Sequence, residues 1–284
     1  MEGLSSVAGG VTAVTGFEKG SGKTTFLNAL LPVARKAGPV AVFSVGVDGA
    51  SKARDGARAP EVFVEEGDVV LTTDLFARSS SARLEVLETL PGRSVLGRLL
   101  LGRAVRRGEV TLVGADHLAA LARAVALVRE EGWAASSLVD GAADRVTQLG
   151  ALGDVGFVYT VRVDRGNLPR VAGRLRALVA LSELPVVPEP PDGTLRLEGP
   201  LTEEVRQGLP EGLVALSLGD FTKVFLPPPE LLRFLARVRC SVRRGTRLLG
   251  VVPALREMGP EELRQAVGPA VAALLLPNPC EVAA

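Results

Sequence analysis

Apolar and polar residues repeat along this chain with two different periods, and these periods predict where strands and helices lie. Residues 10–15 form a short apolar run, and residues 23–36 carry apolar side chains three and four positions apart. These patterns indicate a strand and then an amphipathic helix. Gly38-Pro39 ends the helix, and "PVAVFSVGVDG" follows as a second buried strand. Strand, helix and strand in this order predict a right-handed parallel crossover.

The pattern changes between residues 61 and 114, where β-branched residues and alternation predict a series of strands. These strands form either a β-rich insertion or an antiparallel extension of the sheet, and the pattern leaves both open. Helices are predicted again at residues 118–130 and 167–184, with the strands "SSLVDGA" and "DVGFVYTV" between them.

Proline and glycine crowd the stretch "LPVVPEPPDGTLRLEGP", residues 184–200, which is typical of a linker. Beyond it, "EGLVALSL", "FTKVFL", "RLLGVVPA" and "VAALLL" are predicted to be strands. Helices are predicted at residues 230–238 and 261–267. Helices and strands thus alternate to the end of the chain, which indicates an α/β fold.

The stretch "TGFEKGSGKTT", residues 15–25, joins the first strand to the first helix and has the residue types of a phosphate-binding loop. Its glycines let backbone amides turn inward around an anion, and the helix adds its positive N-terminal end. Five residues separate its first glycine from the Gly-Lys pair, one more than the commonest spacing. We expect the nucleotide to be bound by Gly16, Lys19, Gly20, Ser21, Gly22, Lys23, Thr24 and Thr25.

Two side chains of this loop carry the expected chemistry. Lys23 would bridge β- and γ-phosphate oxygens, and the Thr24 hydroxyl would hold Mg²⁺. Magnesium also needs carboxylates, and Asp48 and Asp140 each end a predicted strand. We assign Mg²⁺ binding to Thr24, Asp48 and Asp140, and catalysis to Lys23 and Asp140. Asp74 is a third carboxylate candidate, and for each aspartate the alternative is a cap at a strand end.

The loop and the alternating elements together predict an α/β fold of the P-loop NTPase type with a mostly parallel sheet. The expected domains are residues 1–186, which bind the nucleotide and include the β-rich insertion at 61–114, and a smaller α/β domain at 187–284. No Asn-Lys-x-Asp guanine signature occurs, so we expect ATP. Asn278 is a candidate for the adenine side, and a turn in the tail is the alternative.

Composition limits the partners and the compartment. The net charge is +1, so no excess of positive charge would attract nucleic acid or an anionic membrane. Cys240 and Cys280 are far apart without metal-binding spacing, and no signal-peptide pattern or apolar run of ~20 residues is evident. We expect a soluble, cytoplasmic protein with no nucleic-acid or membrane partner.

Five stretches resemble one family: "VTGFEKGSGKTTFLNALL", "FSVGVDGA", "PEVFVEEGDVVLTT", "LVDGAADR" and "GDFTKVFL". They are similar to the P-loop accessory proteins, described as reactivase subunits, of B12- and PLP-dependent lysine 5,6-aminomutases. The loop by itself also resembles those of dethiobiotin synthetase and the MinD/ParA ATPases. The first resemblance implies an ATP-dependent protein that restores an inactivated aminomutase, with that enzyme or its accessory subunit as the protein partner.

Three functions stay open at this point. The chain could be an accessory ATPase, an enzyme of the dethiobiotin synthetase type that acts on a small carboxylate, or a nucleotide-binding scaffold with negligible turnover. Lys19 lies four positions before Lys23, whereas the signature lysine of MinD/ParA loops lies five before. Lys19 is therefore not assigned a role across a dimer, and a homodimer stays an open alternative.

Overall fold

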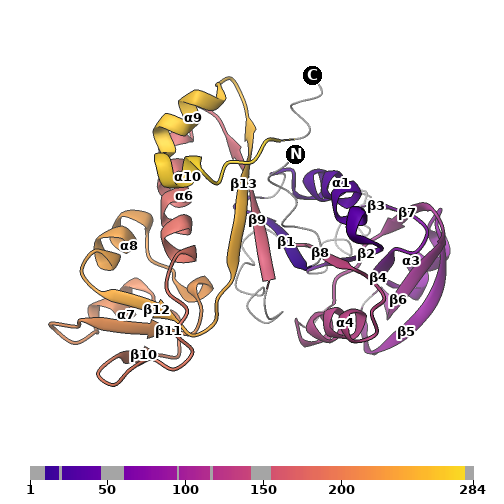
Figure 1. Cartoon of the computed structure of the whole chain (residues 1–284), viewed down its shortest axis with the longest axis horizontal. Coiled ribbons are helices and arrows are strands. Elements are labelled where there is room, and N and C mark those ends of the chain that lie inside the picture. The colour runs from indigo at the N-terminus through magenta and orange to yellow at the C-terminus, as the bar shows by residue number, and fades with distance from the viewer. Residues whose placement is uncertain are drawn as a thin grey trace.

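The structure, a computed structural model, describes residues 10–18, 21–45, 61–94, 96–115, 118–141 and 155–278. Within these residues an eight-stranded sheet has the order β13-β9-β1-β8-β2-β4-β6-β5 (Figure 1). A three-stranded sheet, β10-β11-β12, and a two-stranded ribbon, β3-β7, accompany it. The α/β class and the mostly parallel sheet predicted from the sequence are confirmed.

Six neighbouring strands of the large sheet run parallel, so their carboxyl ends meet at one edge. They are β1 (Val11–Gly16), β2 (Val40–Ser44), β4 (Val69–Thr73), β8 (Ser136–Asp140), β9 (Val155–Val163) and β13 (Arg247–Leu255). The central strands are buried along nearly their whole length, which is typical of parallel strands covered on both faces.

Residues 61–114 extend this sheet with antiparallel strands. Strand β6 (Gly97–Arg106) pairs antiparallel with β4, and β5 (Arg83–Ser94) pairs antiparallel with β6 at the edge. The short helix α3 (Asp74–Ser79) follows β4. Strands β3 (Glu61–Val64) and β7 (Gly108–Thr111) form the separate ribbon. Of the two arrangements that the pattern left open, the structure has the antiparallel extension, with this ribbon beside it.

Helices cover both faces of the large sheet and form two separate cores. Helix α1 (Lys23–Ala34) packs on one face, with Val14 of β1 in the same apolar cluster. Helices α4 (Leu118–Glu130) and α6 (Leu168–Ser182) belong to the cluster that contains Ala13. Successive side chains of a strand point to opposite faces, so Ala13 and Val14 divide β1 between the two cores.

After α6 the chain forms the small sheet and then returns to the large one. The small sheet is parallel and consists of β10 (Leu195–Leu197), β11 (Ala215–Leu218) and β12 (Arg239–Val242), accompanied by α7 (Glu203–Gln207) and α8 (Pro228–Leu235). Strand β13 then pairs with β9, and α9 (Pro260–Val267) and α10 (Pro269–Ala272) pack against α6 (Figure 1). Residues 187–278 therefore contribute to both sheets.

Two strands predicted in this part are wrong. The stretch "FTKVFL" begins with a 3-10 turn, η4 (Phe221–Lys223), because the carboxylate of Asp220 accepts a hydrogen bond from the Thr222 amide at 3.0 Å. The stretch "VAALLL" falls in α10 and the turn after it, where Pro269 occupies the first helical position. Only a single bridge, between Val251 and Leu275, links this stretch to the large sheet within the described residues.

None of the helices in the described part of the chain has the length and the apolar content that a membrane crossing requires.

Candidate phosphate-binding site

The glycine-rich loop, residues 15–25, leaves the carboxyl end of β1 at a reversal in the strand order. Strand β1 lies between β8 and β9. The chain passes from β1 to β2 on the β8 side, and later from β8 across β1 to β9. Such a point in a parallel sheet opens a crevice outside the carboxyl ends of the strands, where α/β proteins bind ligands. The fold therefore sets the loop where a ligand site is expected.

Two glycines of the loop are required by its geometry. A Cβ atom at Gly16 would lie 2.5 Å from Ser21 Oγ and 2.5 Å from the carbonyl oxygen of Thr160. Gly22, the N-cap of α1, has φ 85°, a left-handed conformation that favours glycine. Gly22 has no side chain to cap the first amides of α1, and no acidic residue stands in the first turn. Amides at the start of a helix point outward along its axis and are suited to bind an anion.

Hydroxyl groups attach the middle of the loop to β9. The Ser21 and Thr160 hydroxyl oxygens lie 2.9 Å apart, and both side chains are buried. Thr160 Oγ1 also donates to the carbonyl oxygen of Thr15 at 3.1 Å. The loop is thus fixed at both its start and its middle by one threonine of the neighbouring strand.

Lys23 folds back over the loop. Its ammonium group donates to the carbonyl oxygen of Glu18 at 3.0 Å and to Ser21 Oγ at 3.4 Å. The side chain therefore places a positive charge across the loop, in front of the helix N-terminus. An anion bound by the loop amides would meet this ammonium group.

Thr24 connects the loop to the end of β8. Its hydroxyl donates to Asp140 Oδ2 at 2.9 Å, and only 6% of Asp140 is exposed. The backbone of the β8 end is held on both sides, since Val45 N donates to the Asp140 carbonyl oxygen and Gly141 N donates to the Val14 carbonyl oxygen, each at 2.8 Å. The structure thus brings together two of the three side chains predicted to hold Mg²⁺. Their oxygens fit an ion that prefers oxygen ligands and few protein contacts.

The other predicted site residues have different places. Asp74 is three strands from β1 in the strand order, at the start of α3, where Oδ1 accepts hydrogen bonds from the amides of Leu75 and Arg98 at 3.1 and 3.0 Å. Asp74 therefore serves as a cap, the alternative given for it. Thr25 is exposed on the first turn of α1.

Asn278 donates to the carbonyl oxygen of Pro253 at 3.2 Å and so ties the C-terminal segment to β13. Strand β13 is separated from β1 by β9 alone, and Pro253 lies toward the carboxyl end of β13. Lys19, Gly20 and Asp48 lie outside the described residues.

Sequence reasoning missed two arginines of α6 that lie against the loop. Arg170 Nη2 pairs with Glu18 Oε1 at 3.0 Å. The Arg174 guanidinium lies 3.8 Å from the centre of the Phe17 ring. The same ring makes an edge-to-face pair with Tyr159, with the two ring centres 4.3 Å apart. The signal was available, because two arginines four residues apart in a predicted helix share one face. Which surface that face would meet could not be inferred.

A cavity of about 490 Å³ opens beside these arginines. Phe17 of the loop, Arg170 and Arg174 line one part of it, and apolar residues of α6, α8 and the segment before α8 line the rest. The loop thus borders a space large enough for a small molecule.

Comparisons with protein-family models, with curated proteins and with solved structures find no match to this chain. The interpretation of the site therefore depends on its geometry. Across the described ranges, no group of three or more His, Cys, Asp or Glu residues could hold a metal ion by itself. A magnesium ion at Thr24 and Asp140 would need phosphate or water oxygens to complete its shell.

The close approach at Gly16 can be tested by adding one methyl group. Gly16→Ala should lower the free energy of unfolding by about 1–3 kcal/mol, because the new Cβ overlaps backbone as well as side-chain atoms. Gly10→Ala is the matched control just before β1, where a Cβ meets nothing within 4 Å. Urea denaturation measures both variants, and equal losses would contradict a specific contact at Gly16.

Proposed function

We propose that this chain binds Mg·ATP at the glycine-rich loop and hydrolyses it slowly. The observation that carries the proposal is the 2.9 Å hydrogen bond between Thr24 and Asp140. It joins a hydroxyl in the first turn of α1 to a carboxylate at the end of an adjacent parallel strand. The order of strand, glycine-rich loop, Lys-Thr and helix supports the same conclusion, since it is the order of a P-loop.

Each residue of the loop has a role in this proposal. The uncapped amides at the start of α1 bind phosphate oxygens, and Lys23 exchanges its bond to the Glu18 carbonyl for a bond to phosphate. Thr24 and Asp140 hold the metal, which neutralises charge on the phosphates. Catalysis then consists of positioning and electrostatic stabilisation, with Lys23 as the cationic group that touches the reacting phosphate.

The partner in this proposal comes from the resemblance to aminomutase accessory proteins. We assign the chain the role of an ATP-dependent reactivating factor for a B12-dependent aminomutase. Residues 61–114 support a docking role, because they expose large apolar side chains on the ribbon, on α3 and on β5. The exposed fraction is 44% for Phe63, 58% for Leu75 and 55% for Val86. Exposed apolar side chains of this kind would favour contacts with a protein partner.

A second candidate is an enzyme of the dethiobiotin synthetase type. The 490 Å³ cavity beside Phe17 favours it, because a small substrate held there would lie next to the loop. Arg170 and Arg174 would supply the positive charge that a carboxylate substrate needs. A scaffold with negligible turnover is distinguished from both by the absence of hydrolysis under every condition.

Removal of the Lys23 ammonium tests the nucleotide site. Lys23→Ala should weaken Mg·ATP binding about 10- to 100-fold, because a charge-assisted hydrogen bond contributes about 1.5–3 kcal/mol. Calorimetry measures the affinity, and Lys36→Ala, at an exposed lysine beyond the end of the same helix, is the matched control. Unchanged affinity in Lys23→Ala would mean that the loop is structural, and tighter binding of GTP than ATP would contradict the base assignment.

Asp140→Asn separates metal binding from nucleotide binding. The amide keeps the size of the side chain and can stay beside Thr24, but it loses the negative charge that holds the ion. We expect turnover in Mg²⁺ to fall by at least tenfold, with nucleotide affinity in EDTA changed by less than about threefold. Similar losses in both conditions would remove Asp140 from the metal site.

Turnover with and without a partner distinguishes the candidate functions. Many P-loop proteins are slow until a partner completes the site, so we expect slow hydrolysis by the isolated chain and a rise of tenfold or more with a lysine 5,6-aminomutase and its accessory subunit. Phosphate release measures the rate, and Lys23→Ala is the inactive control. Fast hydrolysis by the chain alone, or phosphorylation of a small carboxylate, would favour the synthetase type instead.

A further inference from the structure

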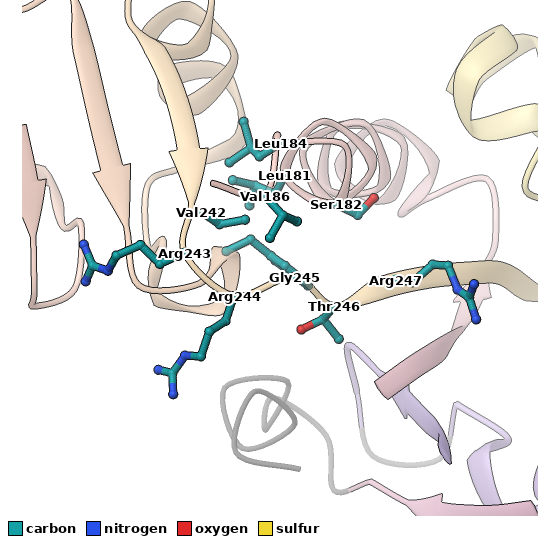
Figure 2. Close-up of a pocket in the computed structure, with 11 residues that line it drawn as sticks. Leu181, Ser182, Leu184, Val186, Val242, Arg243, Arg244, Gly245, Thr246 and Arg247 are labelled. Atoms are coloured by element: carbon teal, nitrogen blue, oxygen red, sulfur yellow. The ribbon is translucent and has the colours of Figure 1, made fainter. Parts of the chain in front are cut away.

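A second cavity, of about 590 Å³, lies near the amino ends of the parallel strands, whereas the glycine-rich loop lies at their carboxyl ends. Figure 2 shows the residues that line it. Arg247, which lines it, begins β13 and pairs with Gly156 near the amino end of β9, whereas Gly16 pairs with Thr160 further along β9. The cavity lies between the C-terminal end of α6 and the loop from β12 to β13. We call this loop together with the first residue of β13, Arg243–Arg247, the basic loop.

The basic loop brings an excess of positive charge to the cavity. Arg243 pairs with Glu198 at 2.9 Å and is only 17% exposed, so its charge is committed to the small sheet. Arg244 is 62% exposed and lies 3.6 Å from the buried carboxylate of Asp220. Arg247 is exposed and has no ion pair in the part of the chain that the structure describes. The basic loop thus carries three arginines, of which two pair with carboxylates.

Other polar groups of the basic loop have no hydrogen-bond partner in the part of the chain that the structure describes. The Thr246 hydroxyl is buried, with 6% of the residue exposed, and makes no hydrogen bond to any described residue. Among the described residues the amides of Gly245 and Thr246 donate to no acceptor either. Buried polar groups without partners are rare because each costs about 1–3 kcal/mol. Figure 2 shows the hydroxyl on the side where Arg244 lies, with Arg247 extending away from it.

The rest of the cavity wall is apolar. Leu184, Val186 and Val242 contribute side chains on the side of the small sheet, and Val186 exposes 54% of its surface (Figure 2). Gly245 passes so close to this wall that a Cβ there would lie 2.6 Å from Val186 Cγ2. An apolar wall with a few polar groups beside it is the usual composition of a small-molecule pocket.

The C-terminal end of α6 borders the cavity and would oppose an anion through its helix dipole. Two of its last carbonyl groups, however, are already used inside the chain. The Val179 carbonyl accepts from Ser182 Oγ at 2.9 Å, and the Leu181 carbonyl accepts from the Leu184 amide at 3.3 Å. The positive groups of the basic loop therefore dominate the polar side of the cavity.

We propose that this cavity binds a small molecule with one anionic head, a carboxylate or a phosphate monoester, on an apolar body. The head lies between Arg244 and Thr246 and accepts hydrogen bonds from the guanidinium, the hydroxyl and the two loop amides. The body packs on Leu184, Val186 and Val242. This site is separate from the glycine-rich loop.

Four probes test the composition of the site in the Lys23→Ala protein, whose glycine-rich loop is weakened for phosphate. Phenyl phosphate and benzoate carry both an anionic head and an apolar ring. Inorganic phosphate has only the head, and phenol has the ring but is uncharged at neutral pH. We expect one of the first two to bind at least tenfold more tightly than inorganic phosphate and phenol, and that probe identifies the head. Calorimetry measures the affinities. Equal affinities, or binding only at tens of millimolar, would overturn the proposal.

Variants then assign the probe to the basic loop. Arg244→Gln should weaken the preferred probe at least tenfold, and Thr246→Val, which keeps the shape of the side chain, about threefold or more. Arg239→Gln removes the same charge from the exposed start of β12 and should change nothing. If Arg244→Gln fails to fold because Asp220 loses its ion pair, Thr246→Val decides. Full affinity in Thr246→Val, or an equal loss in Arg239→Gln, would show that the site is elsewhere.

Discussion

The hydroxyl of Thr24 reaches the carboxylate of Asp140 because β1 and β8 are adjacent and parallel. Val14 and Asp140 are partners in the register of these strands, so both chains arrive at the same edge of the sheet. Thr24 and Asp140 are 116 positions apart in the chain, and helices on both faces keep the two strands buried between two cores. Burial of the strands thus fixes the geometry of the site: a shift of one residue in this register would turn every side chain of β8 to the other face.

The sequence was sufficient to predict the loop and the strands beside it, because their signals are local. Glycines, Lys23 and the apolar period of α1 lie within one short stretch, and Asp140 ends a buried strand. The contacts of Arg170 and Arg174 could not be predicted, since they depend on how α6 crosses the sheet. Tertiary contacts also explain why "VAALLL" is not a strand. Part of it forms α10, which packs against α6, and β13 already occupies the place beside β9.

The stretch at residues 184–200, predicted to be a linker from its composition, contains ordered strand pairing. Leu195–Leu197 lies within it and pairs in parallel with β11, and Val186 forms a bridge to Val242. Prolines exclude long strands but not a three-residue edge strand, which needs few backbone donors. The small sheet is therefore built partly from a segment that looked unstructured, and the wall of the second cavity includes Val186 from the same segment.

Helix α6 connects the two sites that the chain carries. Arg170 in its first turn pairs with Glu18 of the glycine-rich loop, and Leu181 near its end lines the second cavity, a span of about 17 Å at 1.5 Å per residue. A phosphate bound by Lys23 would compete with the bond from this lysine to the Glu18 carbonyl oxygen, and Arg170 pairs with the carboxylate of the same residue. A rigid helix transmits such a change only if it has two packed arrangements, and the influence would then be equal in both directions. The apolar contacts that α6 makes with β9, α8 and α9 are the ones that would have to differ between those arrangements.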